Sequence, residues 1–199
     1  SDLPTDRVLA FGDRDNFWQM ADTGPCGPCS EIHFDRGPEA GCRRPGCRPN
    51  CDCSRFIELW NLVFIQYDRA ADGKIAPLAA RHVDTGMGLE RLAAVLQGRA
   101  SNYDTALFTP ILARIEAVTG RKYAGKDEVA MRVIADHIRT LASAIADGIS
   151  PSNEGRGYVL RRLLRRAARY GRGLLEGETF LHRVVPAVVE TLGEAYPEI

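Results

Sequence analysis

The pattern of hydrophobic residues changes near residue 100, and this change constrains the fold more than any other feature of the chain. Up to about residue 98, apolar runs alternate with clusters of Pro and Gly, a pattern typical of short strands and turns. From about Tyr103 onward, apolar residues recur at the spacing of amphipathic helices. We therefore expect an α+β chain, with a sheet-containing domain in residues 1–100 and an all-α helical domain in residues 101–199.

Local patterns predict the individual elements. The run Phe56–Ile65 is rich in β-branched and aromatic residues, which favours a buried strand, although periodicity alone does not exclude a helix in a continuous apolar run. Leu89–Gln97 is predicted to be a helix that stops at Gly98. Further helices are predicted at residues 105–118, 128–147, 157–171 and 178–195.

The overall composition is that of a globular protein. The chain has 199 residues, 45% of them hydrophobic, which is enough for one sizeable core or two modest domains. No stretch approaches the roughly 20 apolar residues of a membrane span, and the N-terminal residues lack the pattern of a signal peptide. We therefore expect a cytoplasmic protein without a membrane partner.

The formal net charge of zero hides a strongly basic segment. Seven arginines lie between Arg156 and Arg172 with no acidic residue among them, so the rest of the chain carries a net charge of −7. On a helical wheel most of these arginines fall within an arc of about 140°, opposite an apolar side made of Leu160, Leu163, Leu164 and Ala167. A solvated surface would explain this pattern, but a phosphate backbone would also relieve the repulsion between the guanidinium groups.

The cysteines are confined to one short region, from Cys26 to Cys53. Cys42, Cys47, Cys51 and Cys53 lie within 12 positions, in a loop at residues 36–54 that is rich in Gly, Pro and Arg. Four thiolates so close together predict a small structural Zn²⁺ site, with free thiols or disulfides as the alternative. Cys26 and Cys29, together with His33, could replace or supplement some of these ligands.

The most specific segment is Val83–Arg91. Two glycines, Gly86 and Gly88, allow the backbone to approach a flat ligand, and Arg91 could place its planar cation against a phosphate or a base. Taken alone, the same pattern fits a plain strand-to-helix turn.

This segment resembles the third signature motif of class II aminoacyl-tRNA synthetases, in the form found in the alanyl-tRNA synthetases. Further blocks match that family in the family's order, and together they cover the chain from Asp15 to about Glu178. They are residues 16–20, 24–31, 58–61, 132–138, 151–154 and 156–162. The resemblance implies part of an antiparallel synthetase sheet followed by a helical domain that recognises tRNA.

The resemblance also implies a site for alanine and for ATP with Mg²⁺. Asp84 would bind the α-ammonium group, Asn61 would add a neutral hydrogen bond, and Gly86 would leave room for a methyl group. From residue type alone, a turn cap at Asp84 and a satisfied strand amide at Asn61 remain equally open. The implied alanine-binding residues are Trp18, Asn61, Asp84 and Gly86, and the implied ATP-binding residues are Glu58, Gly88 and Arg91. Adenylation needs no enzyme nucleophile or general base, so none is expected.

The implied partner of the basic helix is the acceptor stem of tRNA(Ala), where the family reads a G·U pair. Asn153 matches the loop asparagine credited with part of that recognition, and a loop cap is the alternative. The predicted tRNA-binding residues are Asn153, Arg161, Arg162, Arg165, Arg166 and Arg169.

The first and second signature motifs of the family should precede Asp15, where only 14 residues stand. We therefore expect an alanine–tRNA ligase fragment that is inactive or weakly active by itself. Two other functions stay open: a non-catalytic RNA-binding paralogue with a structural zinc loop, and a metal-stapled interaction module. Retention of Trp18, Asn61, Asp84 and Arg91 together favours the enzyme, because a pure binder has no reason to keep an amino-acid pocket.

Overall fold

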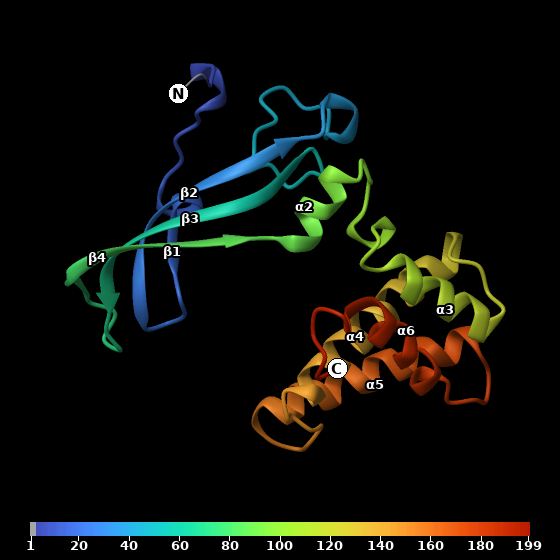
Figure 1. Ribbon diagram of the computed structural model, residues 1–199. Helices are drawn as coiled ribbons and strands as arrows, with labels where there is room; N and C mark the ends of the chain where they lie inside the picture. Colours follow the sequence, from blue (N-terminus) through green and yellow to red (C-terminus); the bar gives the residue numbers. More distant parts are fainter. Residues whose placement is uncertain (1–2) are drawn as a thin grey trace. The chain divides into compact units, whose positions relative to one another are not determined.

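The computed structural model describes residues 3–199, and Ser1 and Asp2 lie outside the described part (Figure 1). The chain forms two compact units, one ending at Gly98 and the other beginning at Arg99. No helix in the described part is both long enough and apolar enough to span a bilayer.

The first unit is built on a four-stranded antiparallel sheet in the order β1-β2-β3-β4. This sheet, together with the helices, confirms the α+β class. Its elements are η1 (Thr5–Arg7), α1 (Asp13–Asn16), β1 (Phe17–Gln19), β2 (Gly24–Asp35), η2 (Pro38–Ala40), β3 (Phe56–Arg69), β4 (Ile75–Met87) and α2 (Leu89–Leu96).

The main strands are longer than the sequence pattern predicts, with 12 to 14 residues in β2, β3 and β4. The Pro and Gly cluster at residues 24–28 lies inside β2, although such clusters are typical of turns. Gly27 belongs there because a Cβ atom at this position would lie 2.0 Å from the Phe64 carbonyl oxygen of β3. Tertiary packing, which a local pattern does not contain, therefore decides the conformation of this segment.

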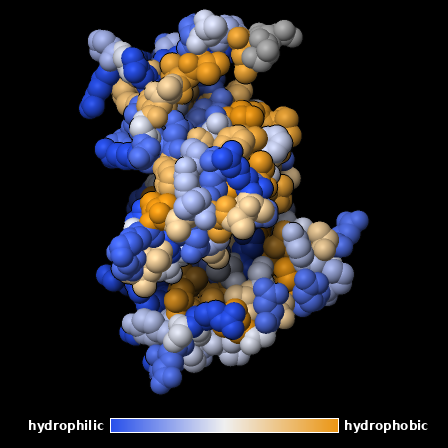
Figure 2. Space-filling model, turned by 90° about the vertical axis from the view of Figure 1, so that its left-hand side faces the viewer, coloured by the Kyte–Doolittle hydropathy of each residue, from blue (hydrophilic) through white to orange (hydrophobic). Residues whose placement is uncertain are grey.

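The strand predicted at residues 56–65 is confirmed as part of β3, but its predicted burial is wrong for most of these residues. Only Val63 is buried, most of the other side chains are half-buried, and Phe64 is 39% exposed. Hydrophobic residues also lie open on the molecular surface among hydrophilic ones (Figure 2). Within this unit α2 is the helix that packs on β3. Because α2 covers only part of the strand, most side chains of residues 56–65 stay partly exposed to solvent.

The described elements of the second unit are helices. α4 packs along α5, and α3 and α6 pack against each other and against α4. The shared core contains Phe108, Ile111, Ile115, Met131, Ile134, Ile138, Phe180, Val184 and Val188. The elements are η3 (Asn102–Asp104), α3 (Thr109–Thr119), η4 (Gly125–Asp127), α4 (Glu128–Ala146), α5 (Gly155–Leu174), η5 (Leu181–Arg183) and α6 (Val185–Leu192).

Two of these helices begin later than their sequence patterns indicate. α3 begins at Thr109 and α6 at Val185, so Pro110 and Pro186 each fall in a first turn. A start at residue 105 or 178 would place these prolines in a helix interior, where a missing N–H group and a steric clash destabilise the helix. The prolines therefore set both starts.

Candidate functional site

One face of the sheet collects the charged and polar side chains. In β2 and β3, Glu31 lies opposite Asn61 and His33 opposite Glu58. Directly opposite residues of an antiparallel pair share a face, as do residues two apart on one strand. Glu31, His33, Glu58 and Asn61 therefore lie on one side, and we call it the polar face of the sheet.

A bulge at Leu59 makes this arrangement possible. Trp60 pairs with Ile32 and Glu58 pairs with His33, so Leu59 is the extra residue of β3. Without the bulge, residues 58 and 61 would point to opposite sides because strand side chains alternate. The Leu59 carbonyl accepts a hydrogen bond of 3.0 Å from the Gly88 N–H, which joins the bulge to the start of α2.

Asp84 and Gly86 of β4 complete the polar face. Gly86 lies opposite Asn61, and Asp84 lies opposite Val63, two residues further along β3. Asp84 and Asn61 are therefore diagonal neighbours on one side of the sheet, at the roughly 7–8 Å separation usual for such pairs. The structure thus brings together three of the four residues expected at the alanine site.

Both polar side chains at this position have unused hydrogen-bonding capacity. Asp84 is exposed and forms no ion pair within residues 3–199, and no side chain caps α2. Asn61 donates from Nδ2 to Glu31 Oε1 at 3.3 Å, while its buried Oδ1 has no partner. The turn-cap alternative for Asp84 and the satisfied-amide alternative for Asn61 therefore do not describe this structure.

Gly86 leaves an open space above the sheet. A Cβ atom built at this residue meets no atom within 4 Å, and its φ angle is not in the left-handed region. Neither packing within the chain nor backbone strain therefore requires a glycine here, and the face above Gly86 is open.

Trp18, the fourth expected residue, is half-buried on β1 and lies opposite Gly27 of β2. In the sheet, β2 and β3 separate β1 from β4. Three strand spacings correspond to roughly 14 Å, so Trp18 is not an immediate neighbour of Asp84 in this sheet.

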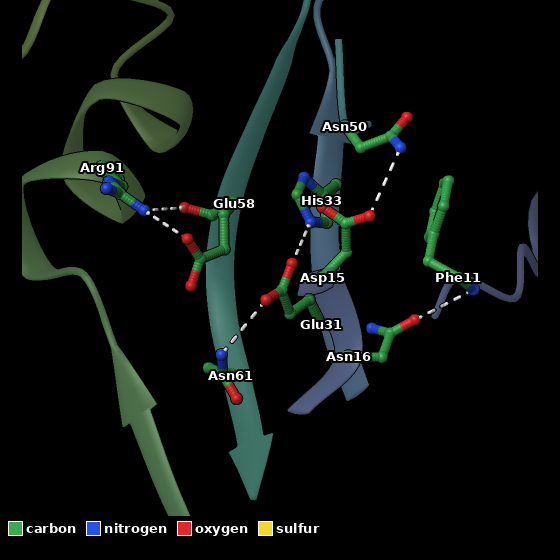
Figure 3. Close-up of polar contacts among 9 residues, drawn as sticks. All are labelled: Phe11, Asp15, Asn16, Glu31, His33, Asn50, Glu58, Asn61 and Arg91. Atoms are coloured by element: carbon green, nitrogen blue, oxygen red, sulfur yellow. Dashed lines mark hydrogen bonds and ion pairs between the residues drawn. The ribbon is translucent and has the colours of Figure 1, made fainter. Parts of the chain in front are cut away.

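Arg91 and Glu58 form a compact pair beside the bulge. The Arg91 Nη1 atom donates to both the carbonyl oxygen and the Oε2 atom of Glu58, each at 3.0 Å (Figure 3). A Cβ atom on Gly88 would lie 3.1 Å from Arg91 Cδ, so the glycine makes room for the folded arginine. The structure therefore brings together all three residues expected to bind ATP.

Glu31 and His33 also lie on the polar face, although the sequence analysis assigned neither of them to the alanine or ATP site. His33 Nε2 lies 2.8 Å from Glu31 Oε2, and the other Glu31 oxygen accepts from Asn61. Burial first, and then the Glu31 charge, raise the pKa of the Cys29 thiol on the same face. The available signal was the pair of ionisable residues two apart within a strand, because such spacing places both on one face.

The four expected zinc ligands converge in the loop that connects β2 to β3. The Sγ atoms of Cys42, Cys47, Cys51 and Cys53 all lie within 4.8 Å of one another. The pairs Cys42–Cys51 and Cys47–Cys53 are each separated by 3.5 Å. Hydrogen bonding from the Arg55 backbone is the main cause that lowers the pKa of Cys53 to about 7, and the Cys42 sulfur raises the pKa of Cys51 to about 12.

Cys26, Cys29 and His33 do not supplement this cluster. Cys26 and Cys29 are both buried in β2, where the pairing with β3 is irregular between them, and neither belongs to the group of thiols that lie within 4.8 Å of one another. His33 is engaged with Glu31.

The basic side of α5 is open to solvent. None of its arginines forms an ion pair within the described part of the chain. Two hollows on this side share Arg166 and Arg169, and one of them extends to Lys126 before α4. The exposed arginines are Arg161, Arg162, Arg165, Arg166, Arg169 and Arg172.

The apolar side of α5 differs from the expected one at one residue. Leu160 and Ala167 are buried, but Leu164 is 38% exposed. Gly157 and Gly171 help to form the buried side instead, since a Cβ atom on Gly171 would lie 3.0 Å from the Phe180 ring. Glycine permits this close packing, and a wheel that counts only apolar residues misses it.

Asn153 lies exposed in the loop before α5, and no side chain caps the start of that helix. The loop is held by Ser152, whose N–H donates to the Gly157 carbonyl at 2.9 Å and whose hydroxyl donates to the Glu154 carbonyl at 3.0 Å. The Asn153 amide is therefore presented by an ordered loop and is not used as a cap.

Comparison with known proteins places these features in a family. A family model described as tRNA synthetases class II (A) matches residues 1–199. The chain is 56% identical over 199 residues to the alanine–tRNA ligase of Desulfosudis oleivorans, covering 99% of this chain and 23% of that protein. It is 55% identical to the alanine–tRNA ligase of Chlorobium phaeovibrioides, covering 98% of this chain and 22% of that protein. The chain thus spans less than a quarter of the length of these curated relatives, and it belongs to the family of class II (A) tRNA synthetases.

Proposed function

We propose that this chain supplies part of the alanine and ATP site of an alanine–tRNA ligase, together with a helical domain that binds the acceptor stem of tRNA(Ala). The observation that carries the amino-acid site is the meeting of Asn61, Asp84 and Gly86 on one face of neighbouring strands. These three residues provide a carboxylate, an amide oxygen without a partner and an open space.

This arrangement fits a small amino acid. The Asp84 carboxylate forms a charge-assisted hydrogen bond with an α-ammonium group, and Asn61 Oδ1 accepts a second one. The open position over Gly86 receives the methyl side chain. Size discrimination of this kind contributes only about 1–3 kcal/mol per methylene, so glycine and serine are rejected incompletely.

The nucleotide is bound on the Arg91 side of the same face. Arg91, held by Glu58, meets the ATP through its planar cation, and Gly88 lets the backbone come close. Mg²⁺ would neutralise phosphate charge, and Glu58 offers it a carboxylate oxygen. The alanine carboxylate then attacks the α-phosphorus, the bond to pyrophosphate breaks, and alanyl-adenylate forms without a covalent enzyme intermediate.

The second unit holds the tRNA. The exposed arginines of α5 carry uncompensated positive charge, which a phosphate backbone neutralises with release of counterions. Asn153 presents an amide that both donates and accepts at a base edge. The exposed amide and the absence of neutralising carboxylates support this assignment over a purely solvated helix.

The four-cysteine loop is a structural zinc site. Sulfur atoms at about 2.3 Å from one tetrahedral zinc lie roughly 3.8 Å from one another. The Sγ separations of 3.5 Å in two pairs, with all four atoms within 4.8 Å of one another, are compatible with that geometry. The site would tie together a long hairpin loop that has almost no apolar core.

The test of the proposed function is alanine-dependent pyrophosphate exchange in a chimera. Residues 1–199 replace the matching segment of the Desulfosudis oleivorans relative, which restores the flanking parts of the longer protein. We expect exchange that depends on alanine, falls at least about 100-fold in Asp84→Ala and survives in Asp22→Ala, which alters an exposed loop carboxylate. Absence of exchange, with tRNA binding intact, would instead support a non-catalytic RNA-binding paralogue.

The chain without its flanking parts is expected to show little or no exchange. The Desulfosudis oleivorans relative is more than four times as long as this chain. None of the arginines in this chain is proposed to bind the α-phosphate of ATP. Measurement of the isolated chain beside the chimera distinguishes a missing segment from a defective site.

A further inference from the structure

Three side chains on the polar face form a continuous polar chain (Figure 3). Asn61 donates from Nδ2 to Glu31 Oε1 at 3.3 Å, and Glu31 Oε2 lies 2.8 Å from His33 Nε2. The side chains of His33 and Glu31 are only 18% and 23% exposed, so solvent screens this chain weakly. Two atoms at its ends, Asn61 Oδ1 and His33 Nδ1, are buried and have no partner.

The hydrogen-bonding groups of the two side chains determine which end of the Asn61 amide faces Glu31. An ionised carboxylate only accepts hydrogen bonds, whereas an amide has one donating and one accepting end. Glu31 therefore selects the Nδ2 end of Asn61, and the Oδ1 end must point elsewhere. Without Glu31, rotation of the amide by half a turn would exchange the two ends at little steric cost.

Glu31 is in turn held on both sides. One carboxylate oxygen accepts from Asn61 and the other faces His33 Nε2, which donates when it carries the proton. His33 sits two residues beyond Glu31 on β2, so the same strand presents both side chains to the polar face. With both oxygens occupied, Glu31 contributes to the site through Asn61 and not as a direct ligand.

We propose that Glu31 is a positioning residue that sets the amide of Asn61 so that Oδ1 accepts a hydrogen bond from the α-ammonium of the amino-acid substrate, with His33 holding Glu31 in place. This inference rests on the proposed alanine site and adds two residues to it. A buried amide oxygen without a partner is costly in a folded protein, and an ammonium group removes that cost on binding.

The proposal predicts a specific rescue. In Glu31→Gln the new amide accepts from His33, so its Nε2 group faces Asn61 and selects the Oδ1 end, and the orientation of Asn61 that suits the ammonium group is lost. In Asn61→Asp two carboxylates face each other. In the double variant Glu31→Gln with Asn61→Asp, the introduced glutamine donates to one oxygen of the introduced aspartate and accepts from His33. The other aspartate oxygen again faces the ammonium.

The experiment measures pyrophosphate exchange in the chimera described above, with alanine and ATP varied separately. Each single variant should raise the KM for alanine roughly 10-fold or more and leave the KM for ATP within about threefold. The double variant should recover to within about threefold of the parent. Glu39→Gln, the same chemical change on a side chain that is 86% exposed, should change neither constant.

Each outcome bears on a different proposal. A parent chimera without pyrophosphate exchange would contradict the proposed alanine site and, with it, the positioning role of Glu31. An active parent with an unchanged KM for alanine in Glu31→Gln would overturn the positioning role alone. Failure of the double variant to recover, with thermal unfolding showing that all variants are folded, would assign Glu31 a merely structural role.

Discussion

Arg91 on α2 reaches back to Glu58 on β3 and donates to both its carbonyl oxygen and its carboxylate, each at 3.0 Å. The bulge at Leu59 turns Glu58 to this side, and the Gly88 N–H bonded to the Leu59 carbonyl places the start of α2 beside it. The pair therefore ties the start of α2 to the strand that carries Asn61.

Loosening this pair should weaken nucleotide binding. Glu58→Gln keeps the size of the side chain but removes the charge that holds Arg91, whose side chain is 48% exposed. We expect the KM for ATP in the chimera to rise about 3–10-fold, with the KM for alanine nearly unchanged. An equal rise in both constants would show that Glu58 supports the sheet as a whole.

A methyl group added at Gly86 should not disturb the fold, but it should interfere with alanine binding. A Cβ atom there meets nothing within 4 Å, so Gly86→Ala should leave the melting temperature of the chain unchanged. The added methyl would occupy the space proposed for the alanine side chain and raise the KM for alanine roughly 10–100-fold. A drop in melting temperature would show that the glycine has a packing role, and unchanged kinetics would place the methyl pocket elsewhere.

Gly88→Ala is the contrasting change. Its Cβ would press on Arg91, 3.1 Å away, so the expected effect is on the KM for ATP. If Gly86→Ala raised the KM for ATP and Gly88→Ala raised the KM for alanine, the roles proposed for the two glycines would have to be exchanged.

The ion pair at the base of the hairpin should give the chain an acid-sensitive component of stability. Hydrogen bonds from Arg55, at 2.7 Å to each carboxylate oxygen, lower the pKa of Asp35 from 3.8 to about 2. A depressed folded-state pKa stabilises the fold above the unfolded-state value and loses that contribution as pH falls from about 4 to about 2.

Asp35→Asn should therefore be less stable than the parent at neutral pH, and the difference should shrink as pH falls through that window. Urea denaturation at a series of pH values measures it, with Asp22→Asn as a control for an exposed loop carboxylate. A difference that stays constant between pH 4 and pH 2 would show that the charge of Asp35 does not contribute.

Reversal of one charge on α5 should weaken tRNA binding in a salt-dependent way. Arg165→Glu is expected to lower the affinity for tRNA(Ala) and to reduce the slope of log affinity against log salt by about one. Lys74→Glu makes the same charge change on the turn between β3 and β4 and should have little effect. Equal effects of both variants would attribute binding to total charge instead of to this helix.

The cysteine loop should bind one zinc ion per chain. Metal analysis should find about one equivalent, and cobalt substitution should produce the charge-transfer absorption of thiolate ligands. Cys47→Ser with Cys53→Ser should abolish both and lower the melting temperature. Disulfides between Cys42 and Cys51 and between Cys47 and Cys53, the pairs at 3.5 Å, would contradict the zinc site and would lower the intact mass by four hydrogen atoms.

Several local features follow from consecutive residues alone. Leu89 was correctly predicted to begin a helix after a glycine turn, and Glu128 to begin the long amphipathic helix, because turn residues and helical spacing are local properties of the chain. The cysteine spacing correctly indicated a loop cluster for a similar reason, since four residues within a short segment cannot move far apart.

Other features depended on contacts between distant residues. No local pattern shows that Leu59 is a bulge, and only that bulge places Glu58 and Asn61 on the same side of β3. Likewise, no local pattern shows that residues 24–28 belong to a strand, or that the backbone of β3 at Phe64 leaves no room for a side chain at Gly27.

The amino-acid sequence alone determined the α+β class, the basic character of α5 and the family, since these follow from composition, periodicity and motif order along the chain. Only the tertiary structure decided that Asn61 and Asp84 share one face, and that Glu31 and His33 stand beside them. The physical reason is strand register, because a shift of one residue in pairing moves every side chain of a strand to the opposite face.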